Sequence, residues 1–483
     1  MKKKKVKNPL RKRILRELCA EWKKYLMVGL FLILTIGFVS GMYVANGSML
    51  TSAKEAVTAN LREDGHFELN KKADKEMLEA VATGKKADVR QYYLDKAKKE
   101  LDKKFKKEFD AGLSKQLPEG VDVTSVPDYD DLYSDAYDEA WEKVEKEIKD
   151  EYKDAEEKYE LDDPDFKAVK VNVYENFYRN EDEDYNADDT VDGTIRVYKK
   201  TDDINLADVL EGRLPGTDRE IAIDRMHADN VGAKVGDTIK VSGREFEIVG
   251  LISYANYYTL HEKSTDLMFD ALKFDVAMVT DEGFDRLDKT VHYVYAWRYE
   301  DSYADEKEEK TFSDNFMRAL ITQSVVFDRE LTDYIPAYAN PAITFATEDM
   351  GSDEAMGGVI LNVLIVIIAF IFAVTISNTI TKESSAIGTL RASGYTRAEM
   401  TGHYLLVPLA VTLISALIGN VLGYTVFKNV IIGMYYNSYS LPEYHTIWNA
   451  DAFVRTTVIP VVLMFIVNLF VITRMMHHTP LQF

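Results

Sequence analysis

The sequence predicts a membrane α-helical fold of four transmembrane helices joined to an α+β extracytoplasmic domain that carries an inserted helical hairpin. Three stretches without Asp, Glu, Lys or Arg, at 355–381, 400–427 and 456–473, are each long enough to cross a hydrocarbon core of about 30 Å as a helix. A fourth apolar stretch lies near the N-terminus. The polar region after it changes along its length from helical spacing to strand alternation, which predicts the α+β domain.

The charge is distributed unevenly along the chain. Residues 1–24 carry a net charge of +9 and residues 357–483 a net charge of +2, so the whole-chain value of −21 leaves −32 on residues 25–356. Lys and Arg beside a membrane span stay on the cytoplasmic side. We therefore expect a multi-pass protein of the bacterial cell membrane, with both termini in the cytoplasm and the acidic region outside. Nucleic-acid binding by the basic end is the alternative, and no nucleic-acid partner is predicted.

Residues 1–24 predict a cytoplasmic, basic amphipathic helix that lies in the lipid interface, and a plain extension is the alternative. Its apolar residues recur every four positions among basic ones, at Leu10, Ile14, Leu18 and Trp22. The first span follows at 25–45. It is longer than the apolar core of a signal peptide and no A-x-A site follows it closely, so we expect it to stay as an anchor. The single cysteine, Cys19, excludes an internal disulfide framework.

Residues 46–356 are expected to form the extracytoplasmic domain. Within them, residues 71–160 predict a helical hairpin, because Lys71–Leu117 and Asp128–Tyr159 both place apolar residues at helical spacing. Two prolines and a glycine punctuate the gap between them. We expect the hairpin to project and to offer a surface to an envelope protein; a pair of helices packed flat on the domain is the alternative.

After Pro164 an alternation of period two predicts the strands of a mixed α+β core at 165–300. The clearest piece is 236–251, which reads as a hairpin that turns at Ser242 and Gly243. The other expected elements are strands at 169–173, 195–197, 221–223, 274–280 and 291–299, a helix at 303–331, and a return to the membrane at 333–353.

The rest of the chain alternates between spans and short connections. The expected order is a second transmembrane helix at 357–381, a cytoplasmic loop at 382–403, a third helix at 404–427, an extracytoplasmic loop at 428–453, a fourth helix at 454–473 and a cytoplasmic tail at 474–483. The interiors of the spans hold no ionisable residue, which argues against solute transport through the bilayer.

Small residues repeat every four positions in three of the spans. This spacing lets helix backbones approach closely and predicts packing between the spans or against a second copy of the chain. The residues are Gly37, Gly41, Ala369, Ala373, Ser377, Ser415, Gly419 and Gly423.

The polar segment between the second and third spans, TKESSAIGTLRASGYTRAEMTGH at 381–403, has helix-like spacing. It predicts one short helix that is pressed against the membrane face and ends at Gly394. Such a helix is a docking point for a soluble partner. The alternative is that it only holds the loop at the membrane face.

The motif KESSAIGTLRASGYTRAEM, followed by HYLLVP and GNVLGYTVF, resembles the membrane domain of FtsX/MacB-type ABC transporter permeases, over residues 357–483. Residues 210–251 resemble the core extracytoplasmic domain of the same permeases. The resemblance implies that such a chain dimerises, binds two ABC ATPase subunits at the cytoplasmic face, and converts ATP-driven closure into movement of the extracytoplasmic domain, which is called mechanotransmission. The ATPase-coupling residues that it implies are Glu383, Ile387, Leu390, Arg391, Gly394 and Tyr395.

No catalytic or nucleotide-binding motif was found. The chain lacks G-x-x-x-x-G-K-[ST], G-x-S-x-G and H-E-x-x-H, so we expect no enzyme activity and no cofactor on this chain, with ATP and Mg²⁺ held by a partner ATPase. The run 182–188 has the alternating acidic spacing of a calcium loop, but Ala187 and Gly193 stand where Gly and Glu are needed. His477 and His478 point about 100° apart on a helix and cannot jointly bind a metal. No metal site is claimed.

Three functions stay open at this point. The first is a permease subunit that acts on an envelope peptide, lipoprotein or lipid-like substrate. The second is a regulator of the same fold that activates a cell-wall hydrolase through its extracytoplasmic domain. The third is a membrane-anchored receptor or scaffold without an ATPase. Larger relatives continue beyond TPLQF at 479–483 into a second membrane half, so the chain is either a half that pairs with a second copy or part of a longer permease.

Overall fold

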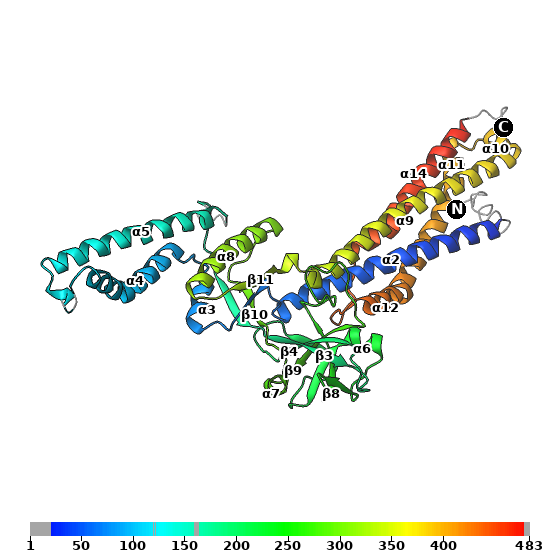
Figure 1. Ribbon diagram of the computed structural model, residues 1–483. Helices are drawn as coiled ribbons and strands as arrows, with labels where there is room; N and C mark the ends of the chain where they lie inside the picture. The colour runs from blue at the N-terminus through cyan, green and yellow to red at the C-terminus, as the bar shows by residue number, and fades with distance from the viewer. Residues whose placement is uncertain (1–20, 119, 121, 159–163, 478–483) are drawn as a thin grey trace, which may run out of the picture.

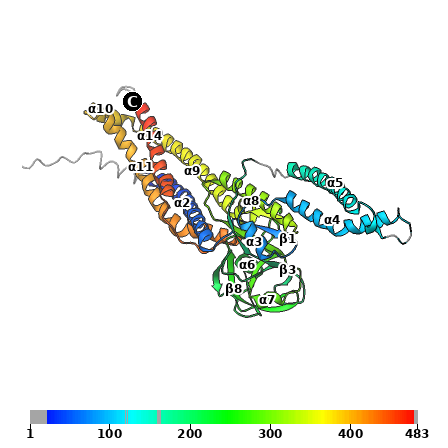
Figure 2. The same ribbon diagram turned by 90° about the vertical axis from the view of Figure 1, so that its left-hand side faces the viewer.

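The computed structural model describes residues 21–118, 120, 122–158 and 164–477. The expected amphipathic helix before Glu21 and the tail after His477 lie outside these ranges. The molecule is elongated, with a bundle of long helices at one end, an α+β domain in the middle and a pair of helices at the other end (Figures 1 and 2).

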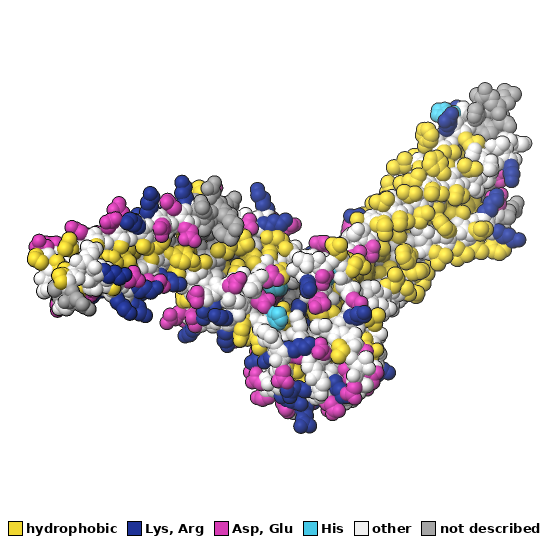
Figure 3. Space-filling model, viewed as in Figure 1, with side chains coloured by type: hydrophobic (Ala, Val, Ile, Leu, Met, Phe, Trp, Pro, Cys, Tyr) yellow, Lys and Arg dark blue, Asp and Glu magenta, His cyan; other side chains and the backbone are white. Residues whose placement is uncertain are grey.

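The bundle contains four helices that are long and apolar enough to cross a membrane, judged by length and composition. Apolar side chains cover its side, and charged ones gather on the rest of the molecule (Figure 3). The first two helices are α2 (Trp22–Ala59) and α9 (Pro341–Lys382); the third consists of α11 (Arg397–Leu422), the π-helical turn η3 (Gly423–Phe427) and α12 (Lys428–Ser438); the fourth consists of α13 (Ala450–Phe453), the π-helical turn η4 (Val454–Val458) and α14 (Ile459–Met476).

The helices α2 and α9 are much longer than a membrane requires. With 38 and 42 residues and a rise of 1.5 Å per residue, they span about 57 and 63 Å, against about 30 Å for the hydrocarbon core. Residues 46–59 and 341–356, which the sequence led us to assign to the separate domain, therefore continue the spans. Likewise, residues 428–438 were expected in a loop, and the structure makes them helical because α12 continues the third span.

Glycines bring α2 and α11 into close contact. A Cβ atom at Gly41 would lie 2.6 Å from Cβ of Phe427, and one at Gly423 would lie 2.8 Å from Cβ of Ser40. A Cβ at Gly37 would lie 3.2 Å from the carbonyl oxygen of Gly419, so these two glycines face each other directly. Of the other small residues singled out from the sequence, Ala369, Ala373 and Ser415 are buried and Ser377 is half-buried.

A polar network inside the bundle joins α2, α11 and η4 through Asn420. Its side-chain oxygen accepts hydrogen bonds from the hydroxyls of Ser40 and Thr456, each at 2.9 Å. Its amide nitrogen donates to Thr457 Oγ1 at 2.9 Å and to the carbonyl of Ala416 at 2.7 Å. Because buried polar groups are costly when unpaired, this network fixes the register of the three segments.

One sheet of the α+β domain is antiparallel, with the strand order β11-β1-β10-β2. Its core contains Phe67, Trp297 and Phe316, and two helices pack on it. Residues 331–336 were expected to lead from a helix back to the membrane, but they form the edge strand β11 because they pair with β1. The elements are β1 (Gly65–Leu69), β2 (Val171–Glu175), β10 (Tyr293–Tyr299), β11 (Leu331–Pro336), α3 (Lys75–Ala82) and α8 (Glu306–Val326).

The second sheet has the order β5-β8-β6-β9-β4-β3-β7, and β7 also pairs with β8, which closes the strands into a barrel with β5 outside the closure. The predicted hairpin of β7 and β8 is confirmed: it turns at Ser242 and Gly243, with φ values of 46° and 75°. The elements are β3 (Tyr178–Asp184), β4 (Gly193–Lys199), β5 (Ala207–Gly212), β6 (Glu220–Asp224), β7 (Thr238–Val241), β8 (Arg244–Tyr254), β9 (Phe274–Val279), α6 (Arg225–Val231) and α7 (Asp281–Asp285).

The helices α4 (Val89–Ser114) and α5 (Tyr129–Lys158) lie side by side and extend away from the sheets (Figures 1 and 2). Aromatic rings pack edge-on between them, for example those of Phe105 and Tyr133 with centroids 5.4 Å apart. The single helix expected at 71–117 is interrupted between α3 and α4. The reason is Gly84, whose φ of 63° is left-handed and breaks the helix.

The turn after α2 is tied to the first sheet by a buried ion pair. Oε1 of Glu63 lies 2.6 Å from Nδ1 of His66, and Oε2 accepts a hydrogen bond from the amide of Asn205 at 2.7 Å. Burial opposes the charge on both groups, but their mutual attraction and hydrogen bond outweigh it. The pKa of the Glu63 carboxyl is therefore lowered and the pKa of His66 is raised.

Replacing Gly41 by Ala should destabilise the bundle by about 1–3 kcal/mol, because the new methyl group collides with Phe427. At Gly402, which has open space around it, the same change should stabilise by about 0.5–1 kcal/mol, because Ala is the better helix former. Thermal unfolding of both variants in detergent measures the difference. Equal effects at the two positions would contradict close α2–α11 packing.

The Glu63–His66 pair predicts a pH window of extra stability. A lowered carboxyl pKa contributes stability above its usual value of 4.5, which is lost as the pH falls. A raised imidazole pKa contributes stability below its usual value of 6.5, which is lost as the pH rises. The destabilisation caused by Glu63→Gln, about 2 kcal/mol, should thus be largest between pH 4.5 and 6.5. A pH-independent difference in melting temperature between variant and wild type would refute this linkage.

Candidate functional site

The loop between the second and third spans forms the short helix α10 (Ser384–Ala392), which begins two residues after α9 ends. Ile387 is fully buried and packs against Ile380, Met400 and Ile472 of the bundle. It therefore fastens α10 to the spans. The resemblance implied that Ile387 is an ATPase-coupling residue, and in the structure its side chain faces the spans. Helical spacing marks an apolar face but does not say which neighbour covers it.

Gly394 ends α10 with a left-handed turn. Its φ is 99°, its N–H donates to the carbonyl of Arg391 at 3.1 Å, and the N–H of Tyr395 donates to the carbonyl of Leu390 at 3.2 Å. These two bonds form a Schellman motif. The side chains of Leu390 and Tyr395 are half-buried against the same apolar cluster as Ile387. The stop at Gly394 predicted from the sequence is confirmed.

Glu383 and Arg391 brace α10 against its neighbours. The hydroxyl of Tyr404 donates to Oε2 of Glu383 at 2.5 Å, and the guanidinium of Arg391 contacts the carbonyl of Met476 at 3.5 Å. The exposed surface of α10 and its C-terminal cap is made of small side chains. They were not singled out from the sequence, because larger ones were selected. These residues are Ser385, Thr389, Ala392 and Ser393.

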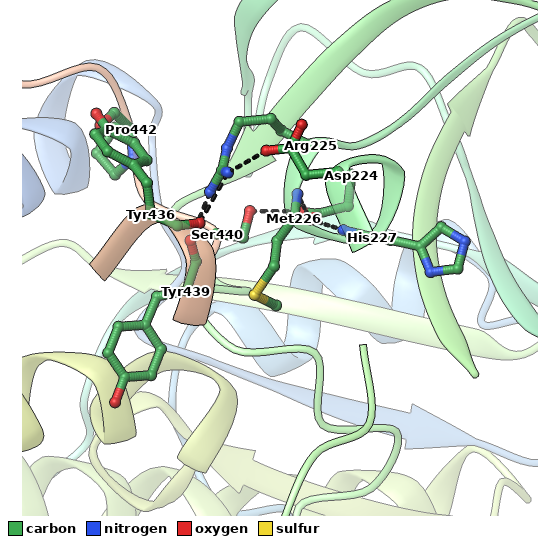
Figure 4. A network of polar contacts seen from close by, with 9 residues as sticks. Asp224, Arg225, Met226, His227, Tyr436, Tyr439, Ser440 and Pro442 are labelled. Atoms are coloured by element: carbon green, nitrogen blue, oxygen red, sulfur yellow. Dashed lines mark hydrogen bonds and ion pairs between the residues drawn. The ribbon is translucent and has the colours of Figure 1, made fainter. Parts of the chain in front are cut away.

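At the opposite end of the bundle, α6 of the barrel is bound to the last turn of α12 and to the residues that follow it (Figure 4). The guanidinium of Arg225 donates to the carbonyls of Tyr436 and Tyr439, at 2.8 and 2.6 Å. The hydroxyl of Ser440 donates to Oδ2 of Asp224 at 2.5 Å, while Oδ1 of Asp224 caps α6. We call these contacts the joint. Nothing in the sequence pairs positions some 210 residues apart, and only the cap at Asp224 was readable.

Further contacts beside the joint connect both long helices to the α+β domain. Tyr258 is buried and donates from its hydroxyl to the carbonyl of Ala53 on α2, at 3.1 Å. The N–H of Thr259 donates to the carbonyl of Ala342 on α9, also at 3.1 Å. Directly after α12, the hydroxyl of Tyr439 donates to Asp349 of α9 at 2.6 Å. These contacts connect α2 and α9 to the loop that follows β8 and to the segment after α12.

Beneath α6 lies a buried cluster of groups able to hold a metal ion. Glu183, His227 and Asp275 each offer one ligand atom, and these atoms lie within 4.8 Å of one another. Burial lowers the pKa of His227, but the charges of Asp275 and Glu183 outweigh it and raise that pKa to about 10. The acidic loop at 182–188 is different: Asp184 accepts hydrogen bonds from the backbone N–H groups of Asp188 and Asp189, at 3.0 and 2.8 Å.

A polar cavity of about 330 Å³ lies between the two sheets. Arg196 forms part of its wall and donates to Asn180, to the hydroxyl of Tyr257 and to the carbonyl of Glu262, at 2.8–3.0 Å. All three acceptors are neutral. The guanidinium also lies over the ring of Tyr178, 4.3 Å from its centroid.

Comparisons with known proteins bear mainly on the bundle. Residues 358–480 match the family model described as FtsX-like permease C-terminal. No curated protein matches the sequence. Among solved structures, the periplasmic region of MacB from Actinobacillus actinomycetemcomitans is similar, with 11% identity, a TM-score of 0.21, and coverage of 36% of this chain and 75% of that one. A TM-score this low carries no argument about the fold. The family match confirms the resemblance seen in the sequence of the C-terminal segment.

Arg225→Ala should loosen the joint, because two charge-assisted hydrogen bonds to carbonyls are lost, worth together about 3 kcal/mol. Hydrogen exchange of the amides at 436–440 should then accelerate by about 100-fold in the full-length chain. Arg244→Ala is the matched control, since Arg244 pairs with Asp288 on the exposed surface of the same barrel. Unchanged exchange at 436–440 in Arg225→Ala would show that these bonds do not hold the joint.

Proposed function

We propose that this chain is the membrane subunit of an ABC transporter, because residues 358–480 match the family model described as FtsX-like permease C-terminal. In this proposal a separate ABC ATPase, which holds ATP and Mg²⁺, docks at α10. Its nucleotide-driven closure moves the spans, and the spans move the α+β domain on the other side of the membrane.

The continuity of α9 is the observation that carries this proposal. The helix runs without a break from Pro341, beside the joint, to Lys382, and one residue then separates it from α10. A helix transmits a tilt along its length because its backbone hydrogen bonds resist bending. The fully buried Ile387 fixes α10 to the same body. A force on α10 is thus delivered to the joint without a flexible segment in between.

The charge distribution supports the orientation that this mechanism needs. Lys382, Arg391 and Arg397 lie at the α10 end of the bundle, and the strongly acidic part of the chain lies in the α+β domain and its helices. Basic residues beside spans favour the cytoplasmic side. We therefore assign α10 and both termini to the cytoplasm and the α+β domain to the exterior of the cell membrane.

A mechanical role fits the interior of the spans better than a solute path does. The buried polar groups around the middle of the bundle are amides and hydroxyls, such as Asn420, Ser40 and Thr457. The buried ionisable residues His403 and Lys428 lie on either side of this region in the third span. Ion and solute pathways usually retain ionisable residues at membrane depth. We propose that the substrate is an envelope peptide, lipoprotein or lipid-like molecule that is handled outside the bilayer, by a pair of copies or by this chain and a second half.

The test is recovery of the ATPase from native membranes with Thr389→Asp. Thr389 is exposed on α10, so a carboxylate there should leave the fold intact and place an unpaired charge in the docking surface. Recovery of a nucleotide-binding subunit should fall at least about tenfold, the equivalent of about 1.4 kcal/mol. Asn437→Asp, exposed at the joint end of the bundle, is the control and should bind like wild type.

Three outcomes distinguish the candidate functions. Capture of no nucleotide-binding subunit by the wild type would favour the receptor or scaffold and contradict the proposal. Equal capture by Thr389→Asp and wild type would place the docking surface elsewhere. Nucleotide-dependent movement of the α+β domain without any translocated molecule would favour activation of a cell-wall hydrolase, in which the α4–α5 pair is the expected contact for an envelope protein.

A further inference from the structure

Glu183, His227 and Asp275 come from three elements far apart in the sequence and meet at one end of the barrel. Glu183 lies on β3, His227 on the first turn of α6 and Asp275 on β9. Their exposed fractions are 1%, 0% and 0%. No spacing motif links such positions, so sequence patterns alone do not reveal the cluster.

The strand register brings the two carboxylates to the same face of the sheet. Glu183 pairs with Gly193 of β4, and Asp275 pairs with Ile195, two residues further along β4. Paired residues, and residues two apart on a strand, project to the same side. Ile195 points into the core of the barrel.

The candidate ligand atoms of the cluster have no hydrogen-bond partner among the described residues. They are both carboxylate oxygens of Glu183, Oδ2 of Asp275 and Nε2 of His227. Nε2 of His227 lies 3.2 Å from Oε1 of Glu183, but the two are not oriented for a hydrogen bond. Buried polar atoms are normally paired, so four that converge without hydrogen bonds call for a ligand.

The remaining polar atoms of the cluster are held by the backbone. Nδ1 of His227 lies 2.8 Å from the carbonyl of Ala271, which can only accept, so Nδ1 carries a proton, and Nε2 offers its lone pair once a metal ion displaces any proton there. Oδ1 of Asp275 accepts from the N–H groups of Val276 and Asp224, at 2.7 and 3.2 Å. Supporting bonds of this kind orient metal ligands in proteins.

The charge of the cluster also suits a cation, because each carboxylate that ionises inside the barrel needs a positive partner. Two ionised carboxylates would carry two negative charges, and a protonated His227 would cancel only one of them. A divalent cation cancels both while the ring stays neutral. Buried charges in proteins are paired or coordinate metals.

We propose that Glu183, His227 and Asp275 bind a divalent transition-metal cation of the Zn²⁺ or Mn²⁺ class. One imidazole and two carboxylates suit these ions, whereas Ca²⁺ and Mg²⁺ prefer oxygen ligands alone. The site is enclosed, so the ion has a structural role. It does not depend on the proposed transporter function.

The ion would stabilise the joint from the opposite side of α6. His227 ties the first turn of α6 to β3 and β9, and the two residues at the start of that turn, Asp224 and Arg225, hold the segment after α12. The ring of His227 points away from Tyr436 and Ser440, so the metal would bind on one side of this turn and the joint contacts lie on the other (Figure 4). Loss of the metal should therefore free α6 and weaken the contact between barrel and spans.

The experiment measures the metal content of the full-length chain in detergent, purified without added metal, chelator or metal-affinity chromatography. Elemental mass spectrometry should find about one Zn or Mn per chain in the wild type. Asp275→Asn and Glu183→Gln should each lower this content at least tenfold. His292→Gln is the control and should keep the metal, because His292 pairs with Glu68 at a partly exposed place.

Thermal unfolding separates a metal from the rival occupant, a proton on His227. After chelation, the wild type should melt earlier and recover by about 5 °C or more in ZnCl₂ or MnCl₂ at a hundred times the Kd. Asp275→Asn should melt below the metal-loaded wild type and gain nothing from either salt. Without a metal, removing a buried charge by Asp275→Asn should instead raise the melting temperature.

A folded wild type without bound metal and without a response to either salt would overturn the proposal. So would equal metal content in Asp275→Asn and wild type. If both variants fail to fold, X-ray absorption of the metal in the wild type decides: one imidazole with oxygen ligands supports the site, and sulfur or several imidazoles refute it.

Discussion

The structure depends on two long helices, α2 and α9, that are continuous over their whole length. Within a bilayer every backbone N–H and C=O must be bonded inside its own segment, so a span has to be helical throughout. Here α2 and α9 stay helical well past that requirement and reach the α+β domain as rods. The amide of Asn46 donates to the carbonyl of Met350 at 2.7 Å and ties the two rods together in their outer halves. The barrel therefore sits on rigid supports.

The two ends of the rods are built from different interactions, and each suits its task. At α10 the contacts within the chain are mainly apolar, centred on Ile387, which leaves a small and polar outer surface. At the joint, Arg225 and Asp224 make short polar bonds to the segment after α12. Apolar packing seats a helix firmly, whereas directed hydrogen bonds fix an orientation. Between the ends, close glycine contacts and the Asn420 network keep α2 and α11 in register.

The sequence was sufficient for whatever depends on local pattern. Charge-free stretches located the spans, alternation located most strands, and Gly394 located the end of α10. The sequence was not sufficient where contacts between distant segments determine the structure. The length of α9 beyond the membrane, the edge strand β11, the inward orientation of Ile387 and the grip of Arg225 on Tyr439 all depend on neighbours brought together by the fold. Periodicity reports that a side chain has an apolar or polar face, but not what lies against it.

In the proposed mechanism, α10 and the barrel belong to one stiff body. Pulsed electron paramagnetic resonance can test it on the full-length chain in lipid nanodiscs, with Cys19 replaced and spin labels at Thr389 on α10 and Asn230 on α6, both exposed. If α10 and the barrel move as one body, the two labels should give a single narrow distance distribution. A broad or multimodal distribution would show a hinge between the two ends and contradict this mechanism.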